Sequence, residues 1–88
     1  ILVGHNAQFD SSFLAAAYKR NNIKKTPFHK FSLIDTVSLG VLATGQTVLA
    51  RICDELGIDY DNDEAHSAAY DTVVTAKVFC SIVNNFDN

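Results

Sequence analysis

The chain contains only two short runs that resemble β-strands, set among four longer runs with helical periodicity. The strand-like runs are residues 1–4 and 31–34, both short and apolar. Two strands make a poor sheet by themselves, and the apolar faces of four helices need a larger surface to cover. We therefore expect an α/β protein whose helices pack on a mixed sheet, with the first strands of that sheet missing from this chain.

The four helices are predicted from apolar residues that recur at intervals of three and four. Their expected ranges are residues 11–21, 36–42, 46–56 and 66–85. Asp10 or Ser11 is the expected N-cap of the first helix, and Asp35 with Thr36 is expected to cap the second. Gly57 is placed to end the third helix in a left-handed conformation.

Charge is distributed unevenly along the chain. Residues 1–34 carry five basic residues against one acid, giving +4, whereas residues 35–88 carry two against nine, giving −7. This asymmetry is found where one face binds a polyanion, although an ordinary solvated surface produces the same pattern. At 48% hydrophobic and 19% charged residues, the chain is too apolar for a disordered tail.

The two cysteines, Cys53 and Cys80, lie within apolar helical stripes. We expect both to be buried small hydrophobic side chains rather than a disulfide or a metal site. The sequence shows no signal peptide and no apolar stretch long enough to span a membrane. A reducing, cytoplasmic location without membrane contact is therefore the expectation.

A polar segment with the sequence His-Asn-Ala-Gln-Phe-Asp follows the first strand directly, at residues 5–10. It places the Asp10 carboxylate where a strand ends and a helix begins, which is the edge at which ligands bind in α/β proteins. The simpler interpretation is that Asp10 only caps the helix. Its position alone does not separate these two interpretations.

A second polar segment opens the last predicted helix and contains His66 and Asp71. Five residues turn a helix by about 500°, so the two side chains diverge by roughly 140° if both are helical. We therefore expect Asp71 to point inward as a metal ligand and His66 to handle protons at the entrance. The alternative is a capping histidine and a solvated aspartate. Small neighbours of Asp71 would let this helix approach the sheet and bring Asp71 near Asp10: Ala68, Ala69 and Thr72.

The two polar segments, in this order, resemble motifs of a known enzyme family. HNAQFD and AHSAAYD are similar to the second and third motifs of the DEDD exonucleases that carry a third-motif histidine, and more closely to the ribonuclease T family. The intervening segments PFHKF and GQTVL are similar in kind and order, so the resemblance covers essentially the whole chain. It implies a partial ribonuclease H-like exonuclease fold, with residues 1–88 as the C-terminal part of one domain.

The resemblance also implies a two-metal hydrolytic site. Asp10 and Asp71 match the metal-binding aspartates of the second and third motifs, and His66 matches the proposed general base. The implied cofactor is Mg²⁺, two ions per complete active site, with Mn²⁺ as an alternative. Two such ions about 3.5–4 Å apart activate water and stabilise the leaving oxygen of a phosphodiester. The implied reaction trims RNA 3′ ends, such as those of tRNA and other stable RNA, and releases nucleoside 5′-monophosphates.

Four further residues match positions that bind the nucleic acid in this family. Phe9 and Phe31 match aromatic positions that stack on the terminal bases of the substrate. Lys24 and Lys25 fall in a basic segment associated with gripping the nucleic-acid backbone in a homodimer. The implied partners are therefore RNA 3′ ends, or single-stranded DNA, and a second copy of the full-length protein.

The chain departs from the family pattern in one respect. The first motif of the family, Asp-x-Glu on the first strand, does not occur before His5. Two of four acidic ligands are therefore missing from this chain, and we expect it to be inactive on its own. Two other interpretations stay open: a DNA proofreading or repair exonuclease with the same motifs, and a non-catalytic nucleic-acid-binding remnant.

Overall fold

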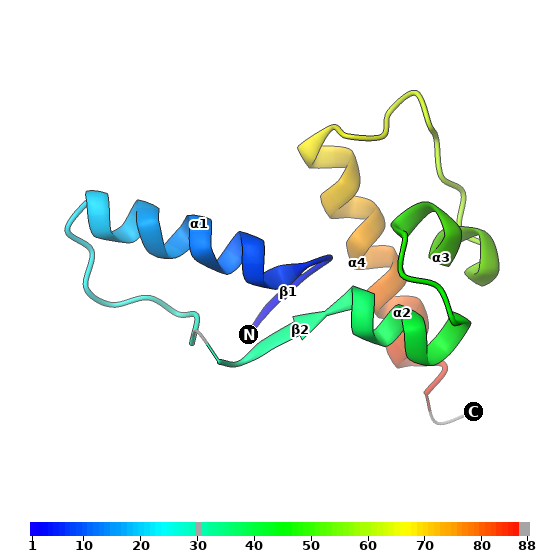
Figure 1. The fold of residues 1–88 in the computed structure, drawn as a ribbon, viewed down its shortest axis with the longest axis horizontal. Coiled ribbons are helices and arrows are strands. Elements are labelled where there is room, and N and C mark those ends of the chain that lie inside the picture. The colour runs from blue at the N-terminus through cyan, green and yellow to red at the C-terminus, as the bar shows by residue number, and fades with distance from the viewer. Residues whose placement is uncertain (30, 87–88) are drawn as a thin grey trace.

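The computed structural model describes residues 1–29 and 31–86, so Lys30 of the predicted basic loop lies outside the described residues. Within this part of the chain, the predicted two strands and four helices are confirmed. Figure 1 shows α1 extending to one side of the strands, while α2, α3 and α4 gather on the other. The elements run in the order β1 (Leu2–Gly4), α1 (Ala7–Arg20), β2 (Leu33–Asp35), α2 (Thr36–Thr44), α3 (Leu49–Leu56) and α4 (Ala68–Asn84).

All four helices differ in their bounds from the prediction, α1 through its earlier start at Ala7 and its end at Arg20. α2 continues to Thr44, past its expected end at residue 42, and α3 begins at Leu49 rather than at residue 46. α4 begins at Ala68 rather than at residue 66, because the Ser67 hydroxyl caps it by accepting the N–H of Tyr70 (3.4 Å). Within the described residues, no single helix is long and apolar enough to cross a membrane. α2 and α3 reach that length and apolarity only when taken together, and a 43° bend separates them.

β1 and β2 form a parallel two-stranded sheet in which Leu2 pairs with Leu33 and Gly4 pairs with Asp35. Parallel neighbours require a crossover connection, which α1 and the segment after it provide. The carboxyl ends of both strands therefore lie at the same edge, where β1 leads into α1 and β2 leads into α2. The α/β class is confirmed, and the larger mixed sheet stays a prediction.

The carboxylate of Asp35 organises the beginnings of two helices. It accepts the N–H of Val37 (2.9 Å), which caps α2 as predicted, and the N–H groups of Asn6 (2.9 Å) and Ala7 (2.8 Å) at the start of α1. Burial acts to raise the pKa of Asp35, but these hydrogen bonds and the nearby His5 lower it more, so the pKa lies below its ordinary value of 3.8. Asp35 thus joins both helices to the edge of the sheet.

The prediction that Asp10 or Ser11 caps the first helix is wrong. α1 begins at Ala7, and its N-cap residue is Asn6 in the left-handed conformation (φ 64°, ψ 56°). The helix begins early because Asp35, from the neighbouring strand, accepts the amides at its start, a contact that the local sequence does not reveal. Asp10 therefore lies inside the first turn of α1, where its carboxylate is available for another role.

The hydrophobic core lies between α3 and α4, with α2 packed against it. Its cluster of buried side chains, each at most 1% exposed, consists of Ile52, Cys53, Val74 and Val78. α2 approaches through Gly40, where an added Cβ would lie 2.9 Å from Cγ1 of Ile52 and 3.2 Å from the carbonyl oxygen of Gln46. Glycine at this position therefore allows α2 and α3 to pack closely.

The two cysteines differ in their surroundings. Cys53 is buried as predicted, and burial raises the pKa of its thiol. The prediction that Cys80 is buried is wrong, because Cys80 lies on the face of α4 that is turned toward a cavity instead of the core. Helical periodicity identified an apolar face of α4 but did not show that one side of it lies open.

Candidate functional site

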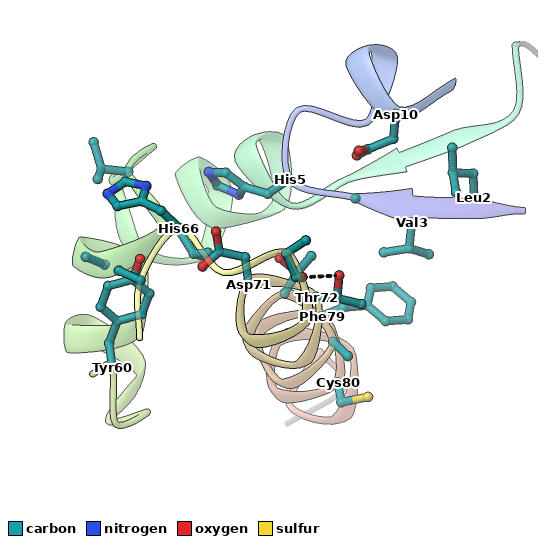
Figure 2. Close-up of a pocket in the computed structure, with 18 of the residues that line it drawn as sticks. Leu2, Val3, His5, Asp10, Tyr60, His66, Asp71, Thr72, Phe79 and Cys80 are labelled. Atoms are coloured by element: carbon teal, nitrogen blue, oxygen red, sulfur yellow. Dashed lines mark hydrogen bonds between the residues drawn. The ribbon is translucent and has the colours of Figure 1, made fainter. Parts of the chain in front are cut away.

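A large cavity opens between β1, α1 and α4, with a volume of about 1300 Å³. Figure 2 shows Val3 of β1 on the same side of the strand as Phe79 of α4, while the neighbouring Leu2 points to the other face of the strand. α4 contacts β1, as the small residues predicted, and its small side chains line the cavity. The same cavity receives a group of polar side chains: His5, Asp10, Asn62, His66 and Asp71.

Asp10 enters the cavity from the first turn of α1, directly beside the end of β1. Its Oδ2 atom lies 2.7 Å from the position that a Cβ atom would take at Gly4. Any residue other than glycine would therefore displace this carboxylate. The close approach places the charge of Asp10 at the carboxyl end of the strand, as the sequence predicted.

Asp71 enters the cavity from the first turn of α4 and is half-buried. Its Oδ1 atom is buried and has no hydrogen-bond partner among the described residues. A buried carboxylate oxygen without a partner is costly, so it needs an explanation such as a bound ion. The pKa of Tyr60, which lines the same cavity, is raised by burial and by the charge of Asp71. The interpretation of Asp71 as a solvated surface residue is therefore wrong.

His66 lies just before α4, in a left-handed conformation with φ 76°. Ser67 is the N-cap of α4, so the interpretation of His66 as a capping residue is wrong, and so is the assumption that His66 is helical. A histidine with positive φ is uncommon, and such conformations occur in turns and at functional sites. In Figure 2 the exposed His66 ring lies on the same side of the cavity as Asp71 and Tyr60.

The structure brings three of the predicted site residues to one cavity. Asp10, His66 and Asp71 all line it, although they come from two segments far apart in the sequence. The parallel strands place α1 beside the end of β1, and α4 packs across the same strand. Two carboxylates and an imidazole in one cavity are a set that can bind a cation and accept a proton.

The four predicted substrate-binding residues lie elsewhere. Phe9 is 62% exposed on α1, where it lines a second, shallower cavity of about 520 Å³. Phe31 is 80% exposed, with its ring centroid 5.7 Å from that of His29. Lys24 and Lys25 are exposed on the segment between α1 and β2, which Figure 1 shows leaving the end of α1 that is away from α4 and returning below α1 to β2. Of the residues described, these two lysines are therefore not neighbours of the large cavity.

His5 is a cavity residue that the sequence analysis did not single out. Its Nδ1 atom is hydrogen-bonded to the Thr36 hydroxyl (2.8 Å), and its Nε2–H donates to the carbonyl oxygen of Thr47 (2.9 Å). The ring thus connects the end of β1 to the start of α2 and to the turn before α3. Its place at the head of the first polar segment was the available signal, but the long-range partners that fix it were not visible in the sequence.

The donor atoms of the cavity fit part of the shell of a hard divalent cation. Carboxylate oxygens are the ligands that Mg²⁺ prefers, and the buried Oδ1 of Asp71 is unpaired. Among the described residues, no group of three or more His, Cys, Asp or Glu side chains is placed to hold a metal ion. Asp10 and Asp71 therefore suit two positions of such a shell, and additional ligands are needed to complete it.

Comparison with known proteins agrees with this arrangement. Residues 1–79 match the sequence profile of the RNase_T family, described as exonuclease. The chain is 59% identical over 86 residues to ribonuclease T of Hahella chejuensis, an alignment that covers 98% of this chain and 39% of that protein. It is 56% identical over 86 residues to ribonuclease T of Buchnera aphidicola subsp. Baizongia pistaciae, covering 98% and 40%. The chain thus spans about two fifths of the length of these curated relatives, and it belongs to the RNase_T exonuclease family.

Proposed function

We propose that the full-length protein containing this chain is a 3′→5′ exoribonuclease that trims RNA 3′ ends, such as those of tRNA and other stable RNA, and releases nucleoside 5′-monophosphates. The observation that carries the proposal is the cavity shared by Asp10, His66 and Asp71, in which the Asp71 Oδ1 atom is buried and unpaired among the described residues. A protein that only binds nucleic acid has no evident need for this set. The ribonuclease T names of both relatives favour RNA over DNA as the substrate.

In this proposal the chain is the C-terminal part of a single exonuclease domain. The large cavity has apolar walls, contributed by Leu2 and Val3 of β1, Leu14 of α1 and Phe79 of α4. Protein interiors are close-packed, so apolar walls around about 1300 Å³ favour filling by additional protein. The remaining strands of a mixed, ribonuclease H-like sheet occupy the apolar part of this space beside β1, and the part lined by Asp10, His66 and Asp71 stays open as the catalytic site.

The catalytic group consists of Asp10, Asp71 and His66. Asp10 and Asp71 hold Mg²⁺ or Mn²⁺ together with acidic ligands from the remainder of the protein. When bound, two such ions lower the pKa of the attacking water and stabilise the leaving oxygen. His66 accepts the proton of that water, and its exposed position lets it return the proton to solvent. The chain alone is inactive in this proposal, because its two carboxylates do not complete the shell.

The bases, and the phosphates away from the scissile bond, are held outside the large cavity. Phe9 and Phe31 stack on terminal bases, which requires exposed rings such as theirs and contributes roughly 1–3 kcal/mol per base. Lys24 and Lys25 contact phosphates, and their distance from the large cavity of their own chain is consistent with serving a second copy in a homodimer.

The two free cysteines are consistent with a reducing cytoplasm.

The proposal is tested with 3′-labelled RNA, Mg²⁺ and the full-length protein. We expect labelled mononucleotide to appear and EDTA to stop its release. Asp71→Asn should lower kcat by about two orders of magnitude or more, the scale for losing a group that stabilises charge in the transition state. The matched control is Asp54→Asn, which removes an exposed carboxylate from α3 and should leave the rate within about twofold.

Each alternative predicts a different result in the same assay. Faster degradation of single-stranded DNA than of RNA would favour a DNA exonuclease. RNA binding that persists in EDTA, without any product from the complete protein, would favour a non-catalytic binding remnant. If Asp71→Asn and Asp54→Asn have equal effects, the assignment of the catalytic residues is wrong.

A further inference from the structure

Phe9 and Phe13 form an exposed aromatic pair on α1. They are four positions apart, so they share one face of the helix. Their ring centroids lie 4.8 Å apart and their planes cross at 64°, an edge-to-face contact. The exposed fractions are 62% for Phe9 and 63% for Phe13. Neither ring belongs to the buried cluster of the described residues, so the core does not hold them in place.

Phe13 lies between the two cavities of the molecule. It lines the large cavity together with Asp10, and it lines the second cavity together with Phe9 and Arg20. The Phe13 ring therefore lies between the cavity that contains Asp10 and the cavity that contains Phe9. A ring in this place is well situated to control how Phe9 is presented near the candidate catalytic group.

We propose that Phe13 is a positioning residue that holds the Phe9 ring in the orientation that receives a base at the 3′ end of the substrate. This inference rests on the proposed function. An exposed phenylalanine rotates about χ1 and χ2, and fixing it when substrate binds costs conformational entropy. The contact with Phe13 restricts that rotation before the substrate arrives. Because this ordering acts on binding and not on the reacting atoms, its loss raises KM and leaves kcat nearly unchanged.

The first experiment measures kcat and KM of the full-length protein with a short single-stranded RNA and Mg²⁺. Phe13→Ala should raise KM by about three- to tenfold, the effect that corresponds to losing one aromatic contact, with kcat within about twofold. Phe13→Tyr keeps the aromatic ring and should restore KM, whereas Phe13→Leu keeps apolar bulk without the ring and should not. The matched control is Phe86→Ala, which removes a 76% exposed ring beyond the end of α4 and should leave KM unchanged.

A double-mutant cycle tests whether Phe13 acts through Phe9. In the Phe9→Ala background, Phe13→Ala should have no further effect on KM, because the ring that it orients is gone. An equal effect in both backgrounds would mean that Phe13 contacts the RNA independently, and the positioning role would be wrong. The melting temperature of each variant shows whether the changes in KM follow changes in stability.

The remaining outcomes separate this inference from the function on which it rests. If the reference protein releases no nucleotide from RNA, the proposed function fails. If it is active and Phe13→Ala behaves as Phe86→Ala does, the inference about Phe13 is overturned while the function stands. If Phe13→Ala lowers both kcat and the melting temperature, and Phe13→Leu restores both, then Phe13 is an ordinary packing residue. That result also overturns the inference.

Discussion

The two sides of the candidate site belong to regions that are packed differently. On the α3–α4 side, four hydrophobic side chains are at most 1% exposed. On the β1–α1 side, Ala7 is the one fully buried hydrophobic side chain among the described residues, and Leu14 is half-buried on the wall of the large cavity. Asp71 therefore stands on the packed region and Asp10 on the open one. The distance between the two carboxylates depends on the contacts that join these regions, which makes those contacts part of the site.

The packed region should be the most sensitive to truncation. Ile52 is fully buried at the centre of the cluster, so Ile52→Ala in the full-length protein should lower the free energy of unfolding by about 2–5 kcal/mol, the cost of lost burial plus a cavity. Denaturant titration followed by circular dichroism measures this effect.

The matched control for Ile52 is Leu42→Ala on α2, where the leucine is 76% exposed. This substitution removes a similar volume from the surface, so it should change the free energy of unfolding by less than about 0.5 kcal/mol. Equal effects of the two substitutions would mean that the α3–α4 cluster is not the stabilising core, and the contrast between the two regions would disappear.

The contrast also explains which parts of the structure were predictable from sequence. The helices, the Gly57 terminus and the Asp35 cap rest on local patterns, so periodicity and capping preferences located them within a few residues. The start of α1 was misplaced because it depends on Asp35, which is distant in sequence. Cys80 was misassigned for a related reason. Periodicity gives the apolar face of a helix but not what covers it.

For the candidate site, sequence motifs identified residue types but not their surroundings. The sequence predicts the roles of Asp10, His66 and Asp71, and the small residues around Asp71 predict its approach to Asp10, but the cavity that all three line depends on parallel strand pairing that no local pattern encodes. The left-handed conformation of His66 was not foreseen, because its position had been assigned to the helix. The hydrogen bonds of His5 join segments more than thirty positions apart, so they became visible only in the folded chain.

Asp35 joins the open and packed regions through the hydrogen bonds of its carboxylate. Asp35→Asn should lower the free energy of unfolding by roughly 1–2 kcal/mol at neutral pH, through weaker acceptance of the Val37, Asn6 and Ala7 amides. The pKa of Asp35 is lowered by folding, so its contribution is present above the ordinary value of 3.8 and is lost as pH falls through the folded-state value. The difference between the two proteins should therefore shrink below about pH 4. Denaturant titrations at several pH values measure it.

A control for the Asp35 prediction is Asp59→Asn, which removes an exposed carboxylate from the segment after α3. Its effect on the free energy of unfolding should stay within about 0.5 kcal/mol. Hydrogen exchange adds a local test, since the amides of Asn6 and Ala7 should exchange faster in Asp35→Asn than in the control. A difference that persists unchanged at low pH would show that the charge of Asp35 is not what joins the two regions.

The smallest effect is expected at the basic segment between α1 and β2, which contains Lys24 and Lys25. Neither lysine lines the large cavity. A double substitution, Lys24→Ala with Lys25→Ala, should reduce the salt dependence of RNA binding. Each single-strand phosphate contact contributes a slope of about 0.7 in log K against log salt, so the slope should fall by about 1.4. Fluorescence anisotropy across about 50–200 mM salt measures this in the Asp71→Asn background, where cleavage is suppressed.

The matched control for the basic segment is Lys77→Ala on α4, which removes an exposed positive charge from the packed region. If Lys77→Ala lowers the slope as much per charge as the double substitution at Lys24 and Lys25 does, overall charge attracts the RNA and the segment has no special role. If neither changes it, the +4 charge of residues 1–34 is an ordinary solvated surface. A reduced slope with the double substitution alone, together with an unchanged kcat when the same two lysines are replaced in the active protein, would mean that this segment contacts phosphates at a place separate from the catalytic group. Because the segment does not line the cavity of its own chain, that result would favour a second copy of the protein as the one it serves.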